Sequence, residues 1–117
     1  MQNLKNCRGG EMRVITVKAG DKLLYVEPQY IEVVIAQPLI WKVPQAEEAI
    51  RGISCYEKKL VVYYQFSGET MADCGVLLKI SDEFLSGIAA DEVEGESDVE
   101  EEDMAQLMTG VWESKRD

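Results

Sequence analysis

The sequence predicts an all-β protein, and two observations carry this prediction. Runs of β-branched and aromatic residues recur about every ten residues along the chain of 117 residues, with Gly, Pro, Asp or Ser between them. Several of these runs alternate apolar and polar residues, which is the period of a half-buried strand. Strands at this spacing indicate a β-sandwich or small β-barrels rather than alternating strands and helices.

The N-terminal half is predicted to begin with a hairpin. Ile15, Val17 and Ala19 alternate with more polar residues, and the turn dipeptide Gly20-Asp21 follows them. Pro28 suits the first position of a helical turn, where no amide proton is needed. The elements expected in this half are strands at residues 13–19, 22–26, 33–35 and 39–43 and a helical turn at residues 28–32.

The C-terminal half is predicted to hold two further pairs of strands and one ambiguous segment. The pairs cover residues 50–56 with 60–66, and 76–80 with 84–90. Residues 97–100 have the form of a capping box, and the apolar residues of 104–111 suit one face of a helix. Residues 107–112 also suit a short strand, so periodicity leaves helix and strand open there. Trp41 and Trp112 are expected in the core, with an interface as the alternative.

The net charge of −10 is concentrated in one segment. Nine acidic residues and no basic one lie between Asp91 and Asp103, and the rest of the chain is nearly neutral. We interpret residues 91–103 as a solvated acidic linker, because the spacing of its acids does not match a calcium-binding loop. Nucleic-acid binding requires a basic stripe, which the sequence does not contain.

The inventory of reactive residues argues against catalysis and against a metal site. The chain has no histidine, which removes the commonest general base and a common zinc ligand. Three cysteines without a CxxC pair predict neither a disulfide framework nor a zinc site, and Cys55 and Cys74 are expected to pack as small apolar residues. An enzyme that uses Cys55 with Lys58 or Lys59 beside it is the catalytic alternative.

The chain shows no signal for export or membrane insertion. No apolar run approaches the ~20 residues of a membrane-spanning helix, and the N-terminus has no apolar region of a signal peptide. We therefore expect a cytoplasmic protein without cofactors, with a polar tail at residues 1–12 and a single domain at residues 13–117.

The stretch Phe84–Gly95 resembles a signature strand of the CheW-type coupling domains of bacterial chemotaxis. These domains carry the pattern G-h-x-V-D-x-V, where h is apolar; Gly87, Ile88, Asp91 and Val93 match it, and Ala90 replaces the first valine. A strand and V-x-E-V turn of the family resemble residues 24–26 and 30–33 of this chain. Residues 42–44 resemble the family's approach to a bend. Residues 50–53 resemble its I-x-G-h strand. The motifs follow one another in the family order over residues 14–95.

The resemblance implies a fold of two small SH3-like β-barrels with an apolar seam between them. It also implies a non-catalytic adaptor that couples the regulatory domain of a histidine kinase to the cytoplasmic tips of chemoreceptors, without cofactors. Two contact regions are expected from it. The residues expected to bind partners are Tyr30, Glu32 and Val33 in one region and Gly52, Tyr56, Glu57 and Lys58 in the other, while Gly87, Asp91 and Val93 are structural.

The sequence departs from the family pattern in two places. The family motif N-L-R-G reads Cys55-Tyr56-Glu57-Lys58 here, so an acid stands where an arginine is usual, and Val62 replaces a proline. The last family strand and closing helix are missing, so we expect the second barrel either to stay open or to be completed by a second copy of the chain in a homodimer. A divergent or truncated scaffold with a different protein partner is the main alternative.

Overall fold

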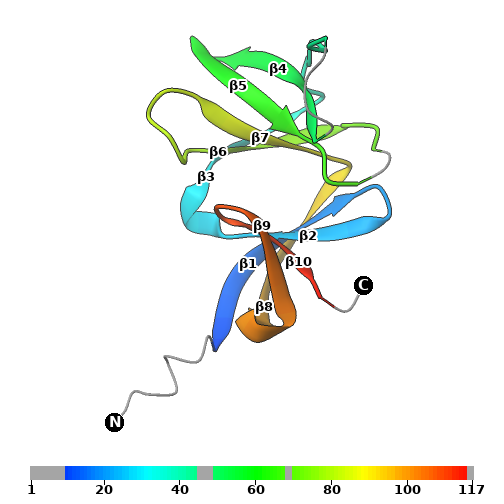
Figure 1. Cartoon of the computed structure of the whole chain (residues 1–117), viewed down its shortest axis with the longest axis vertical. Helices are drawn as coiled ribbons and strands as arrows, with labels where there is room; N and C mark the ends of the chain where they lie inside the picture. Colours follow the sequence, from blue (N-terminus) through cyan, green and yellow to red (C-terminus); the bar gives the residue numbers. More distant parts are fainter. Residues whose placement is uncertain (1–9, 45–48, 68–69, 116–117) are drawn as a thin grey trace.

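Two five-stranded β-sheets make up the computed structural model, which describes residues 10–44, 49–67 and 70–115 (Figure 1). The strands are β1 (Glu11–Ala19), β2 (Lys22–Val26), β3 (Ile31–Ala36), β4 (Ile50–Tyr56), β5 (Lys59–Tyr64), β6 (Cys74–Leu78), β7 (Leu85–Ala90), β8 (Glu92–Glu100), β9 (Met104–Met108) and β10 (Val111–Ser114). Two 3₁₀ turns, η2 (Pro28–Tyr30) and η3 (Glu101–Asp103), interrupt them. The all-β prediction is therefore confirmed.

One sheet is built from both ends of the described chain, and we call it the terminal barrel. Its strand order is β8-β1-β2-β10-β9, with every neighbouring pair antiparallel. The predicted hairpin of β1 and β2 pairs Val17 with Leu24 and Ala19 with Lys22. β1 begins at Glu11, inside the predicted polar tail, and residues 1–9 of that tail lie outside the described residues.

The other sheet holds the strands between residues 31 and 78 together with β7, and we call it the central barrel. Its order is β3-β6-β7-β5-β4, and β5 and β7 are its one parallel pair among the described strands. The strand predicted at residues 39–43 is wrong: this segment makes a single bridge, in which Trp41 and Ile53 exchange two backbone hydrogen bonds of 2.8 Å. Pro38 and Pro44 flank the segment and lack the amide proton that a ladder needs. The bridge joins the chain after β3 to the opposite edge strand, β4.

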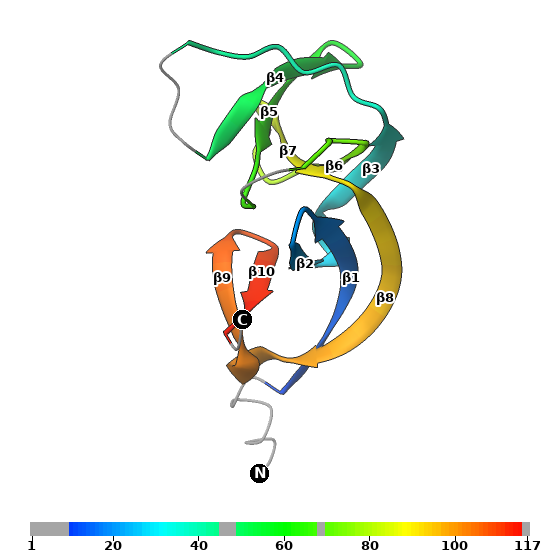
Figure 2. The same ribbon diagram turned by 90° about the vertical axis from the view of Figure 1, so that its right-hand side faces the viewer.

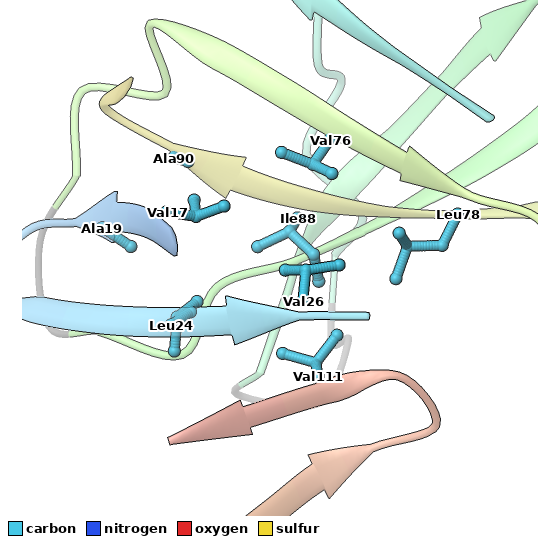
Figure 3. Close-up of a cluster of buried hydrophobic side chains, with 9 residues drawn as sticks. All are labelled: Val17, Ala19, Leu24, Val26, Val76, Leu78, Ile88, Ala90 and Val111. Atoms are coloured by element: carbon cyan, nitrogen blue, oxygen red, sulfur yellow. The ribbon is translucent and has the colours of Figure 1, made fainter. Parts of the chain in front are cut away.

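A shared seam of apolar side chains joins the two barrels (Figure 3). β7 is buried at all six positions, because one face packs inside the central barrel and the other faces the seam. Val17, Leu24 and Val26 of the terminal barrel meet Ile88 and neighbouring residues of the central barrel. A second cluster around Tyr63 fills the central barrel. The seam predicted from the family resemblance is thus present.

The acidic tract forms a strand, not the predicted linker. β8 runs antiparallel to β1 from Lys18↔Glu92 to Glu11↔Glu100 and curves around the terminal barrel (Figure 2). Its sequence alternates acids, which are exposed, with Val93, Gly95 and Val99, which are half-buried. This period of two lets the acids stay in water while the backbone pairs with β1. A bulge at Glu94, which has no partner between the pairs Thr16↔Gly95 and Val17↔Val93, adds to the bend.

The segment that periodicity left open is a β-hairpin. β9 and β10 pair with each other around Gly110, whose φ of 83° suits a tight turn, and β10 also pairs with β2. Val111 is fully buried opposite Val26, so tertiary pairing decides against the helix. The capping-box residues 97–100 lie within β8 instead. Within the described residues, the outer strands β8 and β9 each pair with one strand only.

Candidate functional site

The β4–β5 hairpin carries the charged residues of the second predicted contact region at its tip. Tyr56 and Lys59 form the last pair, and Glu57-Lys58 is the two-residue turn between them. Both turn residues have positive φ, 48° for Glu57 and 70° for Lys58. This conformation matches the right-handed twist of the strands but is normally supplied by Asn and Gly. Both side chains are exposed to solvent.

Tyr56 brings the two predicted contact regions together. Its ring is half-buried against the core of the central barrel, where Val33 and Ile35 of β3 also pack. Burial raises the pKa of Tyr56 above its ordinary value, and the nearby carboxylates of Glu57 and Glu32 raise it further. The charge of Glu32 on β3 thus acts on the ring hydroxyl of Tyr56 on β4. We call Glu32, Tyr56, Glu57 and Lys58 the hairpin site.

Three other residues predicted to bind partners lie elsewhere or are covered. Gly52 is buried, and a Cβ added there would lie 2.4 Å from the carbonyl oxygen of Trp41, so Gly52 permits the Trp41 bridge. Val33 is half-buried against the central core. Tyr30 packs against the seam, and its ring covers Gly110 of the terminal barrel. These positions support the fold around the hairpin site in the described structure.

The three residues predicted to be structural lie along the junction of β7 and β8. Gly87 faces the ring of Tyr63, since an added Cβ would lie 2.7 Å from two ring carbons. Val93 is half-buried and packs against the seam. The resemblance therefore points to positions that organise the core, although their partners could not be named from the sequence.

Asp91 joins the two barrels through its carboxylate. One oxygen, Oδ2, accepts a hydrogen bond of 2.8 Å from the amide of Gly20 in the β1–β2 turn. The other, Oδ1, accepts one of 2.6 Å from the Thr70 hydroxyl and one of 3.0 Å from the Met71 amide. These donors, led by Thr70, lower the pKa of Asp91 below its ordinary value. Asp91, predicted to be structural, thus ties the β1–β2 turn of the terminal barrel to the chain that precedes β6 in the central barrel.

Trp41 and Cys55 differ from the sequence prediction in burial. The Trp41 side chain is 54% exposed, not in the core, and Cys55 is exposed rather than packed. Leu60 on β5 is 47% exposed beside them. Trp112 is half-buried, and its indole Nε1 donates a hydrogen bond of 2.8 Å to Glu27. The one sequence signal for this exposure is the position of Trp41 between Pro38 and Pro44, which favours an irregular and solvent-accessible segment.

The described residues include no cluster of three or more His, Cys, Asp or Glu side chains that could hold a metal ion. The acids of β8 alternate along an exposed strand and do not converge on one point. Among the described residues no helix has the length and apolar character that crossing a bilayer requires.

Comparison with known proteins supports the fold. No protein-family model matches the sequence, and no curated protein does. Two five-stranded β-sheets on a common seam make up the all-β, CheW-like fold, and this chain has that fold. It is similar to the crystal structure of the scaffolding protein TtCheW from Thermoanaerobacter tengcongensis, with a TM-score of 0.62 and 16% sequence identity. The match covers 80% of this chain and 65% of the length of TtCheW.

Proposed function

We propose that this protein is a non-catalytic, cytoplasmic adaptor of a chemotaxis-type signalling assembly, which binds the regulatory domain of a histidine kinase and the tips of chemoreceptors. The observation that carries the proposal is the likeness of the two-barrel fold to a scaffolding protein over 80% of the chain. The absence of histidine and the exposed, charged tip of the hairpin are in keeping with a binding role.

The hairpin site supplies the specificity of the proposed contact. Glu57 and Lys58 project from a turn that is held by the β4–β5 ladder, so their backbone positions are preorganised. Apolar neighbours such as Leu60 supply area that loses water on binding, while the charges select the partner. Glu32 adds a second carboxylate whose charge acts on Tyr56, so the hairpin site as defined holds two acids and one base.

This charge pattern favours a partner with basic residues opposite the hairpin site. Related domains usually carry an arginine where this chain has Glu57, and a carboxylate cannot replace its forked guanidinium. A partner surface whose acids bind that arginine would therefore be repelled by Glu57. The partner kinase is therefore expected to carry a compensating base. A scaffold of the same fold with an unrelated basic partner is the second candidate, and Glu57 is the observation that favours it.

Titration of the Glu57→Arg variant with the regulatory domain of the kinase from the same cell tests the proposal. We expect its dissociation constant to change by about tenfold or more, because a charge at the contact is reversed. Glu94→Arg on β8 is the matched control: it changes net charge equally on an exposed strand of the other barrel. The proposal would be contradicted if the wild type, Glu57→Arg and Glu94→Arg bound the regulatory domain with equal affinity, or if the wild type did not bind it.

A further inference from the structure

Sheet pairing places five apolar or weakly polar side chains on one face of the central barrel. Directly opposed residues of an antiparallel pair point to the same side, and the pairs are Trp41↔Ile53, Ile53↔Val62 and Cys55↔Leu60. Ile53 and Cys55 are two residues apart on β4 and so share that side. We call Trp41, Ile53, Cys55, Leu60 and Val62 the outer face.

The outer face is open to solvent, whereas the reverse side of the same strands is core. Val61 and Tyr63 of β5 point inward and are fully buried. On the outer face, by contrast, Trp41 is 54% exposed and Leu60 47% exposed. A contiguous apolar surface of this kind on a small domain is typical of a contact with another protein. Tryptophan is also one of the three residue types that are enriched among those that dominate binding energy.

The backbone at the edge of β4 is only partly paired. Ile53 exchanges two hydrogen bonds with Trp41, and Cys55, two residues further along, directs its amide and carbonyl to the same edge. Neither group of Cys55 has a backbone partner among the described residues. The outer face therefore ends in an unpaired strand edge, a feature that another chain can cover.

Charge distribution favours a second copy of the chain as the occupant. Segments 10–30 and 91–115, which form the terminal barrel, carry 13 acidic and four basic residues, so two terminal barrels repel each other. The central barrel lies at the opposite end of the long axis of the molecule, which extends 50 Å (Figure 1). Contact through the outer faces separates the acidic β8 strands by far more than the screening length of about 8 Å at physiological ionic strength.

The rim of the outer face is also self-complementary in charge. Lys42 follows Trp41 and is exposed, and Glu57 and Lys58 lie at the tip of the adjoining hairpin. A two-fold axis brings the same surface of both copies together, so an acid on one copy can face a base on the other. We infer that two copies of this protein associate through their outer faces into a symmetric dimer. This inference does not rest on the proposed adaptor role. Because both contacts use Leu60 and the tip of the β4–β5 hairpin, one copy makes only one of the two contacts at a time.

Sedimentation of the full-length protein over micromolar to submillimolar concentrations tests the inference. We expect a reversible dimer for the wild type and an increase of about tenfold or more in its dissociation constant for Leu60→Glu, which places a charge in the contact. Leu23→Glu is the matched control, since Leu23 is a similarly exposed leucine, 38% exposed, on the terminal barrel. It is expected to leave the dimer unchanged.

Cys55 provides a second readout because it lies on the middle strand of the outer face. In a chain with Cys7→Ser and Cys74→Ser, a short bis-maleimide is expected to link two copies at Cys55, and Leu60→Glu is expected to prevent it. Circular dichroism checks that each variant is folded. If Leu60→Glu does not fold, Trp41→Gln replaces it as the variant that disrupts the outer face. A wild type that stays monomeric, a dimer that only Leu23→Glu weakens, or a dimer that resists linkage would overturn the inference. A monomer that binds a different apolar protein surface would also overturn it.

Discussion

Replacing Asp91 with asparagine is expected to loosen the junction between the barrels. The carboxylate accepts three hydrogen bonds, from Gly20, Thr70 and Met71, at 2.6 to 3.0 Å. A hydrogen bond contributes about 1 kcal/mol net in a partly solvated setting, so Asp91→Ala should lower the free energy of unfolding by about 3 kcal/mol. Asp91→Asn keeps one acceptor oxygen and should cost about 1–2 kcal/mol, because its amide group cannot accept from a backbone amide.

The pH dependence of this loss of unfolding free energy shows whether the negative charge of Asp91, rather than the shape of its side chain, provides the stabilisation. The pKa of Asp91 is lowered in the folded protein, whereas an aspartate in an unfolded chain titrates near ~3.9. The stabilisation is therefore full above the unfolded pKa and is lost as the pH falls through the lowered folded value. The difference in unfolding free energy between wild type and Asp91→Asn should be largest above about pH 4 and shrink below it.

Urea unfolding followed by circular dichroism at several pH values measures both quantities. Asp98→Asn is the control: Asp98 is an exposed acid on β8 whose carboxylate lies 3.5 Å from Arg13. Such a surface ion pair contributes only about 0–1 kcal/mol. An Asp91→Asn variant that unfolds like the wild type at neutral pH, or whose loss of unfolding free energy is the same at every pH, would contradict a stabilising role of the Asp91 charge.

Two further predictions concern the core and the hairpin. The Tyr63 hydroxyl is buried without a hydrogen-bond partner among the described residues, and burial raises the pKa of Tyr63 to about 12. Tyr63→Phe should therefore leave the unfolding free energy unchanged or raise it by up to about 1 kcal/mol; a loss above about 1 kcal/mol would reveal a partner for the hydroxyl. Replacing Glu57-Lys58 with Asn-Gly should raise the unfolding free energy by about 1–2 kcal/mol, because both positions have positive φ. Thermal unfolding measures both effects, and a destabilised Asn-Gly variant would contradict the second.

The strands were predictable where burial follows a simple alternation. β1, β2, β4 and β5 lie within a few residues of their predicted positions, because their apolar residues recur with the period of a strand. The acidic composition of residues 91–103 led to the wrong prediction of a linker where the structure has β8. Its acids have low strand propensity, yet their strict alternation leaves a half-buried face that pairs with β1. The alternation was visible in the sequence, but the nine acids outweighed it in the prediction.

The hairpin site was only partly predictable. Family resemblance pointed to Tyr56 and Glu57, and to Glu32 in a separate region. Their proximity depends on β3 and β4 lying at opposite edges of a sheet that curls on itself, which no local pattern encodes. The exposure of Trp41 was missed for a related reason. It arises from a single bridge between distant segments, and the size of the side chain favoured the core.

The pairing of β1 with β8 bears on how the chain folds during synthesis. β1 and β2 leave the ribosome before the other described strands, but their outer partners, β8 and β10, are made about 70 residues later or more. At ~5–20 residues per second, the first hairpin waits for several seconds with the apolar side of Val17 and Leu24 uncovered. The central barrel, whose strands are nearly contiguous, can assemble in that interval and offer its seam as a first surface. Chaperone dependence is therefore expected to concentrate on the nascent N-terminal hairpin.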